Sequence, residues 1–168
     1  MKRIMLAILA VLMLLPLIAC GKSGGASWKD FTAGGVTLTL NEKCADALKA
    51  LEGSRSRITA TPSCGDAKKD GEDVVYEYQN LGFRLNTYRE KENDPNELLR
   101  SIEIYTDNAK TPEGITIGSS EEAARTAYGT PTREKDSVLT YAGKKAELQL
   151  KIEGGKVKQI CYFSTVKA

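Results

Sequence analysis

The stretch Ala146–Phe163, AELQLKIEGGKVKQICYF, decides the fold that the sequence predicts. Apolar and polar residues alternate strictly through AELQLKIE (146–153), which is typical of a β-strand with one face in the core. The pair Gly154-Gly155 then has the length and composition of a two-residue hairpin turn. The segment therefore predicts an antiparallel hairpin with the apolar residues of its first strand facing inward.

The turn also predicts the register of this hairpin. Regular pairing places Ile152 opposite Val157 and Leu148 opposite Cys161. Cys161 then shares the core face with Leu148. By the same alternation Phe163 is assigned to the core face, whereas Ile160 and Tyr162 point away from it.

Similar segments occur twice along the chain. The matching pairs are GVTLTL (35–40) with GITIGS (114–119), VVYEYQNLGFRLN (74–86) with SVLTYAGKKAELQ (137–149), and SIEIYTD (101–107) with KQICYFS (158–164). Each half reads β-α-β-β-β, or α-β-β-β if its first segment is only an extended lead-in. We therefore expect a globular domain over residues 31–168, built of repeats 35–107 and 114–166.

A helix is predicted after the first segment of each half. The first has an apolar stripe at i, i+3, i+4 and i+7, formed by Cys44, Ala47, Leu48 and Leu51, and ends at Gly53. The second begins near Ser119, which has capping-box spacing with Glu122, carries the stripe Ala124, Ala127 and Tyr128, and stops at Gly129-Thr130-Pro131. These helices are expected on one face of a mostly antiparallel sheet, which is an α+β fold.

The cadence GITIGSSEEAARTAYGTP (114–131), followed by a three-stranded meander, resembles two groups of bacterial lipoproteins. One has the β-lactamase-inhibitor-like fold, with two tandem helix-plus-sheet units, and the other is the BamE (SmpA/OmlA) group, with one unit. The resemblance covers residues 35–166. It implies binding through variable surface side chains, so no functional residue is carried over from it. The longer connection that holds Cys64 and the charged run 66–73 departs from the pattern.

The first nineteen residues have the features of an export signal: Lys2 and Arg3, then an apolar run shorter than the roughly 20 residues that span a bilayer. The next feature is LIAC (17–20), which resembles the lipobox of bacterial lipoproteins. That resemblance implies cleavage before Cys20, lipid on its sulfur, and attachment to the extracytoplasmic face of a membrane. An uncut N-terminal anchor is the alternative. Residues 20–30 are then a flexible tether.

Composition excludes several kinds of function. Without residues 1–19 the chain has 22 basic and 22 acidic residues and no cluster of Lys and Arg that would track nucleic acid. It contains no histidine, which is the commonest general base and the commonest metal ligand. No G-x-S-x-G stretch is present, and the acidic groups at 66–73 and 90–94 lack the EF-hand pattern. We expect neither catalysis nor a metal or other cofactor.

The cysteines suggest one disulfide, because an exported chain meets oxidising conditions. Cys44 and Cys64 are the expected pair, since the long connection after the first helix allows Cys64 to fold back onto it. A pairing of Cys44 with Cys161 is the alternative. Whichever thiol remains unpaired is expected to be buried and inert.

The tyrosines divide into two sets by strand alternation. The core set is Tyr76, Tyr78, Tyr128 and Tyr141. The outward set is Tyr88, Tyr105 and Tyr162, together with Ile160 and beside Arg84. Tyrosine and arginine are favoured at protein interfaces, so the outward set predicts a binding surface. The alternative is a sheet face that merely keeps good strand formers.

The favoured function is a lipid-anchored, non-catalytic module that binds a protein or another ligand of the cell envelope. Two further functions stay open. By analogy with the BamE group the chain would be a structural lipoprotein of envelope assembly, and by analogy with the β-lactamase inhibitors it would inhibit an exported hydrolase.

Overall fold

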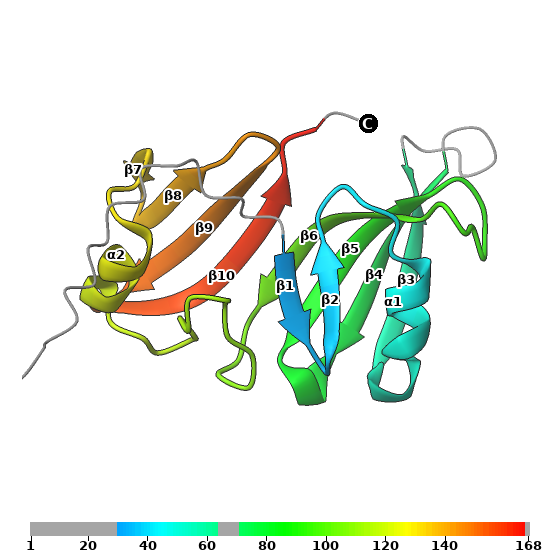
Figure 1. Cartoon of the computed structure of the whole chain (residues 1–168), viewed down its shortest axis with the longest axis horizontal. Coiled ribbons are helices and arrows are strands. Elements are labelled where there is room, and N and C mark those ends of the chain that lie inside the picture. Colours follow the sequence, from blue (N-terminus) through cyan, green and yellow to red (C-terminus); the bar gives the residue numbers. More distant parts are fainter. Residues whose placement is uncertain (1–29, 64–70, 167–168) are drawn as a thin grey trace, which may run out of the picture.

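The computed structural model describes residues 30–63 and 71–166, and its dominant feature is a single antiparallel sheet of eight strands (Figure 1). Strands hold 49% of the described residues and helices 16%. The expected α+β fold is therefore wrong, and the domain is mostly β. The physical reason is length. Helix α1 spans only Ala45–Ala50 and continues as the 3-10 turn η1, Glu52–Ser54, while α2 spans Glu121–Tyr128, so neither offers more than about two turns of apolar surface.

The large sheet consists of two four-stranded meanders. The first runs through β3 (Arg57–Pro62), β4 (Glu72–Tyr78), β5 (Phe83–Arg89) and β6 (Leu98–Ile104), with the 3-10 turn η3 (Gln79–Leu81) between β4 and β5. The second runs through β7 (Arg133–Lys135), β8 (Val138–Ala142), β9 (Ala146–Glu153) and β10 (Lys156–Ser164). The two join where β6 pairs with β10, from Ile104 opposite Ile160 to Ser101 opposite Phe163.

Each meander has one strand more than the sequence predicted. The additional strands, β3 and β7, are the two edges of the sheet, and all of their residues are exposed. An exposed edge strand needs no alternation of apolar and polar residues, so hydrophobic periodicity does not detect it.

A second, two-stranded sheet packs on the large one. It is the hairpin of β1 (Asp30–Ala33) and β2 (Val36–Thr39), closed by Gly34 and Gly35 with φ of 57° and 77°. Strand β2 is the predicted segment 35–40. Its counterpart at 114–119 forms no strand; it contributes the bridge between Lys110 and Thr116 and exchanges backbone hydrogen bonds with Val157 through Gly118 and Ser119.

The hairpin of β9 and β10 corrects the predicted register. Ile152 lies opposite Val157 as expected, but Gln159 rather than Lys158 lies opposite Lys151, so Lys158 forms a β-bulge. Every later side chain of β10 therefore lies on the face opposite to the one predicted. Ile160 and Tyr162 are buried, at 0% and 1% exposed, whereas Phe163 is 36% exposed and Cys161 is only half-buried.

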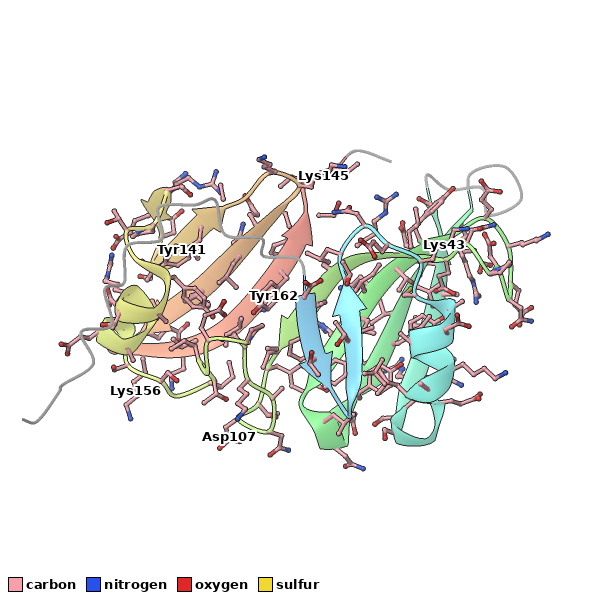
Figure 2. All side chains as sticks on the ribbon, viewed as in Figure 1. Lys43, Asp107, Tyr141, Lys145, Lys156 and Tyr162 are labelled. Carbon is pink, nitrogen blue, oxygen red and sulfur yellow. The ribbon has the colours of Figure 1, made fainter. Side chains whose placement is uncertain are left out.

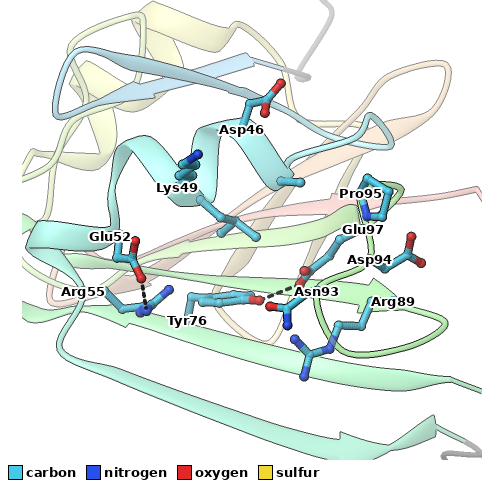
Figure 3. Close-up of a pocket in the computed structure, with 12 residues that line it drawn as sticks. Asp46, Lys49, Glu52, Arg55, Tyr76, Arg89, Asn93, Asp94, Pro95 and Glu97 are labelled. Carbon is cyan, nitrogen blue, oxygen red and sulfur yellow. Dashed lines mark hydrogen bonds and ion pairs between the residues drawn. The ribbon is translucent and has the colours of Figure 1, made fainter.

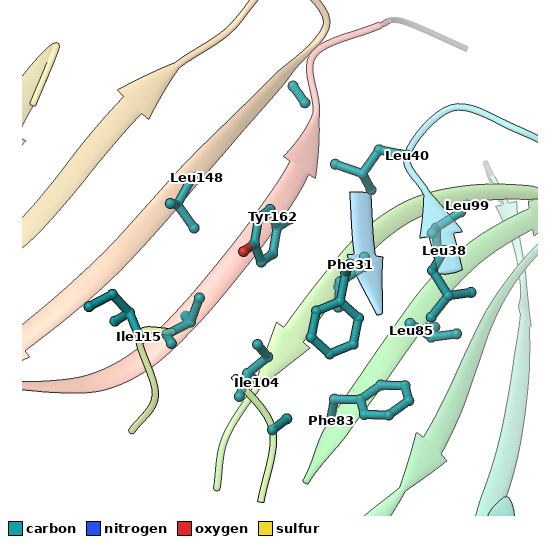
Figure 4. Close-up of a cluster of buried hydrophobic side chains, with 14 of the residues drawn as sticks. Phe31, Leu38, Leu40, Phe83, Leu85, Leu99, Ile104, Ile115, Leu148 and Tyr162 are labelled. Carbon is teal, nitrogen blue, oxygen red and sulfur yellow. The ribbon is translucent and has the colours of Figure 1, made fainter. Parts of the chain in front are cut away.

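The core lies on one face of the large sheet, which we call the covered face. In Figure 1 the β1–β2 hairpin, α1 and α2 all lie in front of this face. The ring of Phe31 in β1 packs against Phe83, with centroids 5.3 Å apart, and against Tyr162, at 6.4 Å (Figure 4). The hairpin thus packs over the junction of the two meanders.

The predicted core positions of the regular strands are confirmed. Tyr76, Tyr78 and Tyr141 are at most 4% exposed, and Tyr128 packs against the core while partly buried. Figure 2 shows Tyr141 and Tyr162 among the side chains of the second meander. The remaining confirmed positions are Ala146, Leu148, Leu150 and Ile152 of β9, and Ile102 and Ile104 of β6.

The two helices agree with the sequence in their buried stripe but not in the residue that caps the second. The buried stripe of α1 and η1 includes Cys44, Leu48 and Leu51. Helix α2 is capped by Ser120, whose hydroxyl accepts from the Ala123 N–H at 3.1 Å, and not by Ser119 as expected.

Candidate functional site

The face of the large sheet opposite the core, which we call the open face, carries three of the five predicted binding residues: Arg84, Tyr88 and Tyr105. No helix among residues 30–63 and 71–166 lies over it (Figure 1). Strand alternation brings a row of polar side chains together across this face, because Glu77, Arg84 and Glu103 are successive neighbours on β4, β5 and β6. Cys161 of β10 follows beside Glu103.

A hollow of about 480 Å³ lies at one end of this row. Arg84 and Tyr105, two of the predicted binding residues, both line it. The other lining residues are Glu77, Gln79, Glu103 and Thr106. The volume is that of a small-molecule site or of a recess that accepts one or two side chains of a partner.

An ion pair holds Arg84 in this hollow. Its Nε and Nη2 atoms donate to the same carboxylate oxygen of Glu103, at 2.6 and 2.5 Å, and the other oxygen of Glu103 accepts from Gln159 at 2.7 Å. No described residue accepts a hydrogen bond from Nη1 of Arg84. The guanidinium is therefore fixed by one edge and offers its other edge to a ligand.

Tyr105 adds an aromatic ring with a neutral hydroxyl. Partial burial raises the pKa of Tyr105, and the negative charge of Glu77 raises it further. The hydroxyl thus keeps its proton at neutral pH and is able both to donate and to accept a hydrogen bond.

The other three predicted binding residues lie elsewhere. Tyr88 is on the open face at the far end of β5, with the guanidinium of Arg100 5.8 Å from its ring centre. Ile160 and Tyr162 belong to the core because of the bulge at Lys158. Of the five residues, only Arg84 and Tyr105 share one hollow.

Three residues of the open face were missed by sequence reasoning. Glu103 and Glu77 were recognisable from the alternation of their strands, as the charged neighbours of Arg84. Phe163, 36% exposed, was assigned to the core, because nothing local in the sequence marks the bulge that turns it outward.

The two described cysteines are both free thiols. Cys44 is buried on the covered face and Cys161 lies on the open face, so the alternative disulfide between them is not formed. The favoured partner of Cys44, Cys64, lies outside the described residues, as does the predicted lipidation site Cys20. Among the described residues no three His, Cys, Asp or Glu side chains are grouped to hold a metal ion.

Comparison with known proteins adds little. No family model matches the chain, and no curated protein matches it. A solved structure with 13% sequence identity is the uncharacterized protein yfeY from Escherichia coli; the match covers 79% of this chain and 96% of that one, with a TM-score of 0.46. Within the described part of the chain, no helix is long and apolar enough to cross a membrane. The resemblance to lipoprotein families stays a prediction.

Proposed function

We propose that this chain is an exported protein, anchored to a membrane by lipid on Cys20, that binds an envelope or secreted protein without catalysing a reaction. The main support for the proposal is that Arg84 and Tyr105 line the same hollow of the open face. Both residue types are enriched where binding energy is concentrated at interfaces.

The partner is expected to present a carboxylate or a carbonyl to the hollow. Arg84 offers hydrogen-bond donors in a fixed plane, and Tyr105 offers an aromatic surface beside them. The acidic side chains Glu77 and Glu103 line the same hollow, so a ligand with a large excess of negative charge is disfavoured. Because positive and negative side chains both line the hollow, the partner is expected to be recognised by its shape and by a few hydrogen bonds rather than by a large net charge.

Photo-crosslinking of the full chain in its native membrane tests the proposed surface. A photoreactive amino acid in place of Gln79, which lines the hollow, should give a defined adduct, whereas the same group in place of Glu122, exposed on α2, should not. The double substitution Arg84→Ala and Tyr105→Ala should abolish the Gln79 adduct. The matched control Arg133→Ala, on the exposed edge strand β7, should leave it unchanged.

Equal adducts at both positions, or an adduct that survives the double substitution, would refute the open face as the binding surface. The anchor is tested separately. Cys20→Ser should release the chain from the membrane fraction, and mass spectrometry of the native protein should find a lipid-modified Cys20 at its amino terminus. An unmodified thiol there would refute the anchoring part of the proposal.

A further inference from the structure

A second pocket, on the covered side of the molecule, is lined by a buried glutamate, Glu97, that accepts side-chain hydrogen bonds from the described residues through only one of its carboxylate oxygens. The pocket has a volume of about 390 Å³ and lies between α1 with η1 on one side and the loop from β5 to β6 on the other (Figure 3). Tyr76 of β4 lies between these two walls, and Glu97, just before β6, lies beside it.

The backbone holds Glu97 in place from both directions. Its carbonyl accepts from the N–H of Cys44 at 2.9 Å and from the Cys44 thiol at 3.3 Å. Its own N–H donates to the Asp94 carbonyl at 3.2 Å. Asp94 is itself buried, and its carboxylate accepts from the N–H groups of Glu90 and Asn96. The position of Glu97 is thus set by the loop and does not depend on its own carboxylate.

Both side-chain hydrogen bonds to the Glu97 carboxylate end on the same oxygen, Oε1. Glu97 is 4% exposed, and its Oε1 accepts from the hydroxyls of Tyr76, at 2.9 Å, and Thr87. No residue among 30–63 and 71–166 donates to Oε2, and none of their Lys or Arg side chains forms an ion pair with Glu97. Because Glu97 lines the pocket, Oε2 is the carboxylate oxygen that is left to accept a hydrogen bond from a ligand there.

Three cations line the pocket: two are paired with carboxylates other than Glu97, and the third, Lys49, is exposed on α1. Arg55 pairs with Glu52 at 3.2 Å while its guanidinium lies 5.9 Å from the centre of the Tyr76 ring. Arg89 pairs with Glu72 at 2.7 Å. None of these cations forms an ion pair with Glu97, although the charges of Arg89 and Glu97 interact at a distance, so the carboxylate is still able to pair with a cationic ligand.

We propose that this pocket binds a primary alkylammonium group, with the –NH3⁺ donating to Oε2 of Glu97 and the alkyl chain lying along Tyr76 and Leu48. An ammonium supplies both the missing donor and the missing positive charge, and Leu48 provides an apolar wall. The four carboxylates that line the pocket outnumber its three cations, which favours a positively charged ligand. The pocket is within the size range of small-molecule sites. This site is separate from the open face and does not depend on the function proposed for that face.

The same ammonium chemistry is available from a free amine or from a lysine side chain of a polypeptide. Calorimetric titration of the full chain in detergent at pH 7 with cadaverine and with Nα-acetyl-lysinamide distinguishes these sources. Saturable binding of at least one of them is expected, and 1-pentanol, which lacks the charge, should not bind. Tighter binding of cadaverine indicates a free amine as the ligand, and tighter binding of the lysine derivative indicates a polypeptide.

Glu97→Gln is the informative substitution, because the amide oxygen still accepts from Tyr76 and Thr87 while the charge is lost. It should weaken binding of the amine at least tenfold. Glu122→Gln, at an exposed carboxylate on α2, is the matched control and should bind as the unaltered chain does. Equal affinity of the Glu97→Gln chain, or no binding of either amine by the unaltered chain, would overturn the proposal.

A second substitution tests the pocket without changing Glu97, and it remains informative if the Glu97→Gln chain does not fold. Ala45→Phe fills the pocket from α1 and leaves Glu97 untouched. It should abolish amine binding while the far-UV circular dichroism stays unchanged. Undiminished binding by this folded variant would also contradict the pocket as the site.

Discussion

Tyr162 lies directly opposite Leu148 in the ladder of β9 and β10, and both side chains are buried on the covered face. This relationship exists because Lys158 is an extra residue in β10 and shifts the pairing by one. The Tyr162 ring also packs against Phe31, at 6.4 Å between ring centres. One bulge therefore places a large aromatic side chain at the junction of the two meanders.

Tyr162 and its neighbour Phe163 should differ sharply in their contribution to stability. Tyr162→Ala should lower the free energy of unfolding by roughly 3 to 5 kcal/mol, the range for truncating a buried aromatic side chain. Phe163→Ala, at a 36% exposed position, should cost less than about 1 kcal/mol. Urea denaturation followed by circular dichroism measures both. The regular hairpin without a bulge predicts the reverse order, so a larger loss for Phe163→Ala would refute the bulge.

Gly82 should tolerate a methyl group poorly. It follows η3 with a φ of 77°, and a Cβ there would lie 2.0 Å from the hydroxyl oxygen of Thr106. Gly114 has a similar φ of 85° but nothing within 4 Å of the added atom, so it is a matched control for the backbone strain alone. We expect Gly114→Ala to cost about 1 kcal/mol and Gly82→Ala at least twice as much.

Thermal unfolding of the two variants compares these costs, and equal melting temperatures would contradict the close approach of Gly82 to Thr106. Gly82→Ala should also perturb the hollow of the open face. The carbonyl of Gly82 accepts from the N–H groups of Tyr105 and Thr106, which both line it.

Stability should fall at alkaline pH. Burial raises the pKa of Cys44 from near 9 to about 12, with the charge of Glu97 adding to the effect, and burial raises the pKa of Tyr78 from 10 to about 12. The unfolded chain therefore releases these protons first. These groups should leave the free energy of unfolding unchanged between about pH 7 and pH 9 and then decrease it up to about pH 12, by about 1.4 kcal/mol per pH unit for each buried group.

Urea denaturation at a series of pH values measures this decrease. Cys44→Ala should reduce the slope between pH 9 and pH 10, where tyrosines contribute little. A free energy of unfolding that does not change between pH 8 and pH 11 would contradict the burial of these groups.

Both described thiols should be inert in the native protein. Burial, together with the charge of Glu103, raises the pKa of Cys161 to about 12, so this thiol, like Cys44, is protonated at pH 8. Only the thiolate reacts with iodoacetamide. Peptide mass spectrometry should therefore find neither cysteine alkylated before denaturation.

In denaturant without a reductant, Cys44 and Cys161 should then both be labelled. Labelling of Cys44 only after reduction would instead support its predicted disulfide with Cys64. Rapid labelling of Cys161 in the native protein would show that this thiol is more exposed to solvent than the structure indicates.

The candidate sites were predictable only where the strands are regular. Arg84 and Tyr105 were assigned to one face from alternation alone, and the structure places them in one hollow. Glu97 carried no signal. It follows an acidic run, Glu90 to Asp94, that composition assigns to a solvated loop, yet Asp94 and Glu97 are 5% and 4% exposed. Their burial depends on α1 packing over the end of that loop, and the sequence of the loop does not encode this contact.

The sequence by itself determined the local features of this protein: the buried face of β9, the turn at Gly154-Gly155, the inward tyrosines of β4 and β8, and the short helices that cover them. These depend on side-chain periodicity and on backbone freedom within a few residues. Only the tertiary structure decided that β6 pairs with β10, that Lys158 is bulged, and that β3 and β7 complete the sheet. Those features depend on packing between segments far apart in the chain. When β6 and the Phe31 ring pack against β10, the burial of Ile160 and Tyr162 is favourable enough to stabilise the bulge, so the alternation within β10 alone does not predict which side chains face the core.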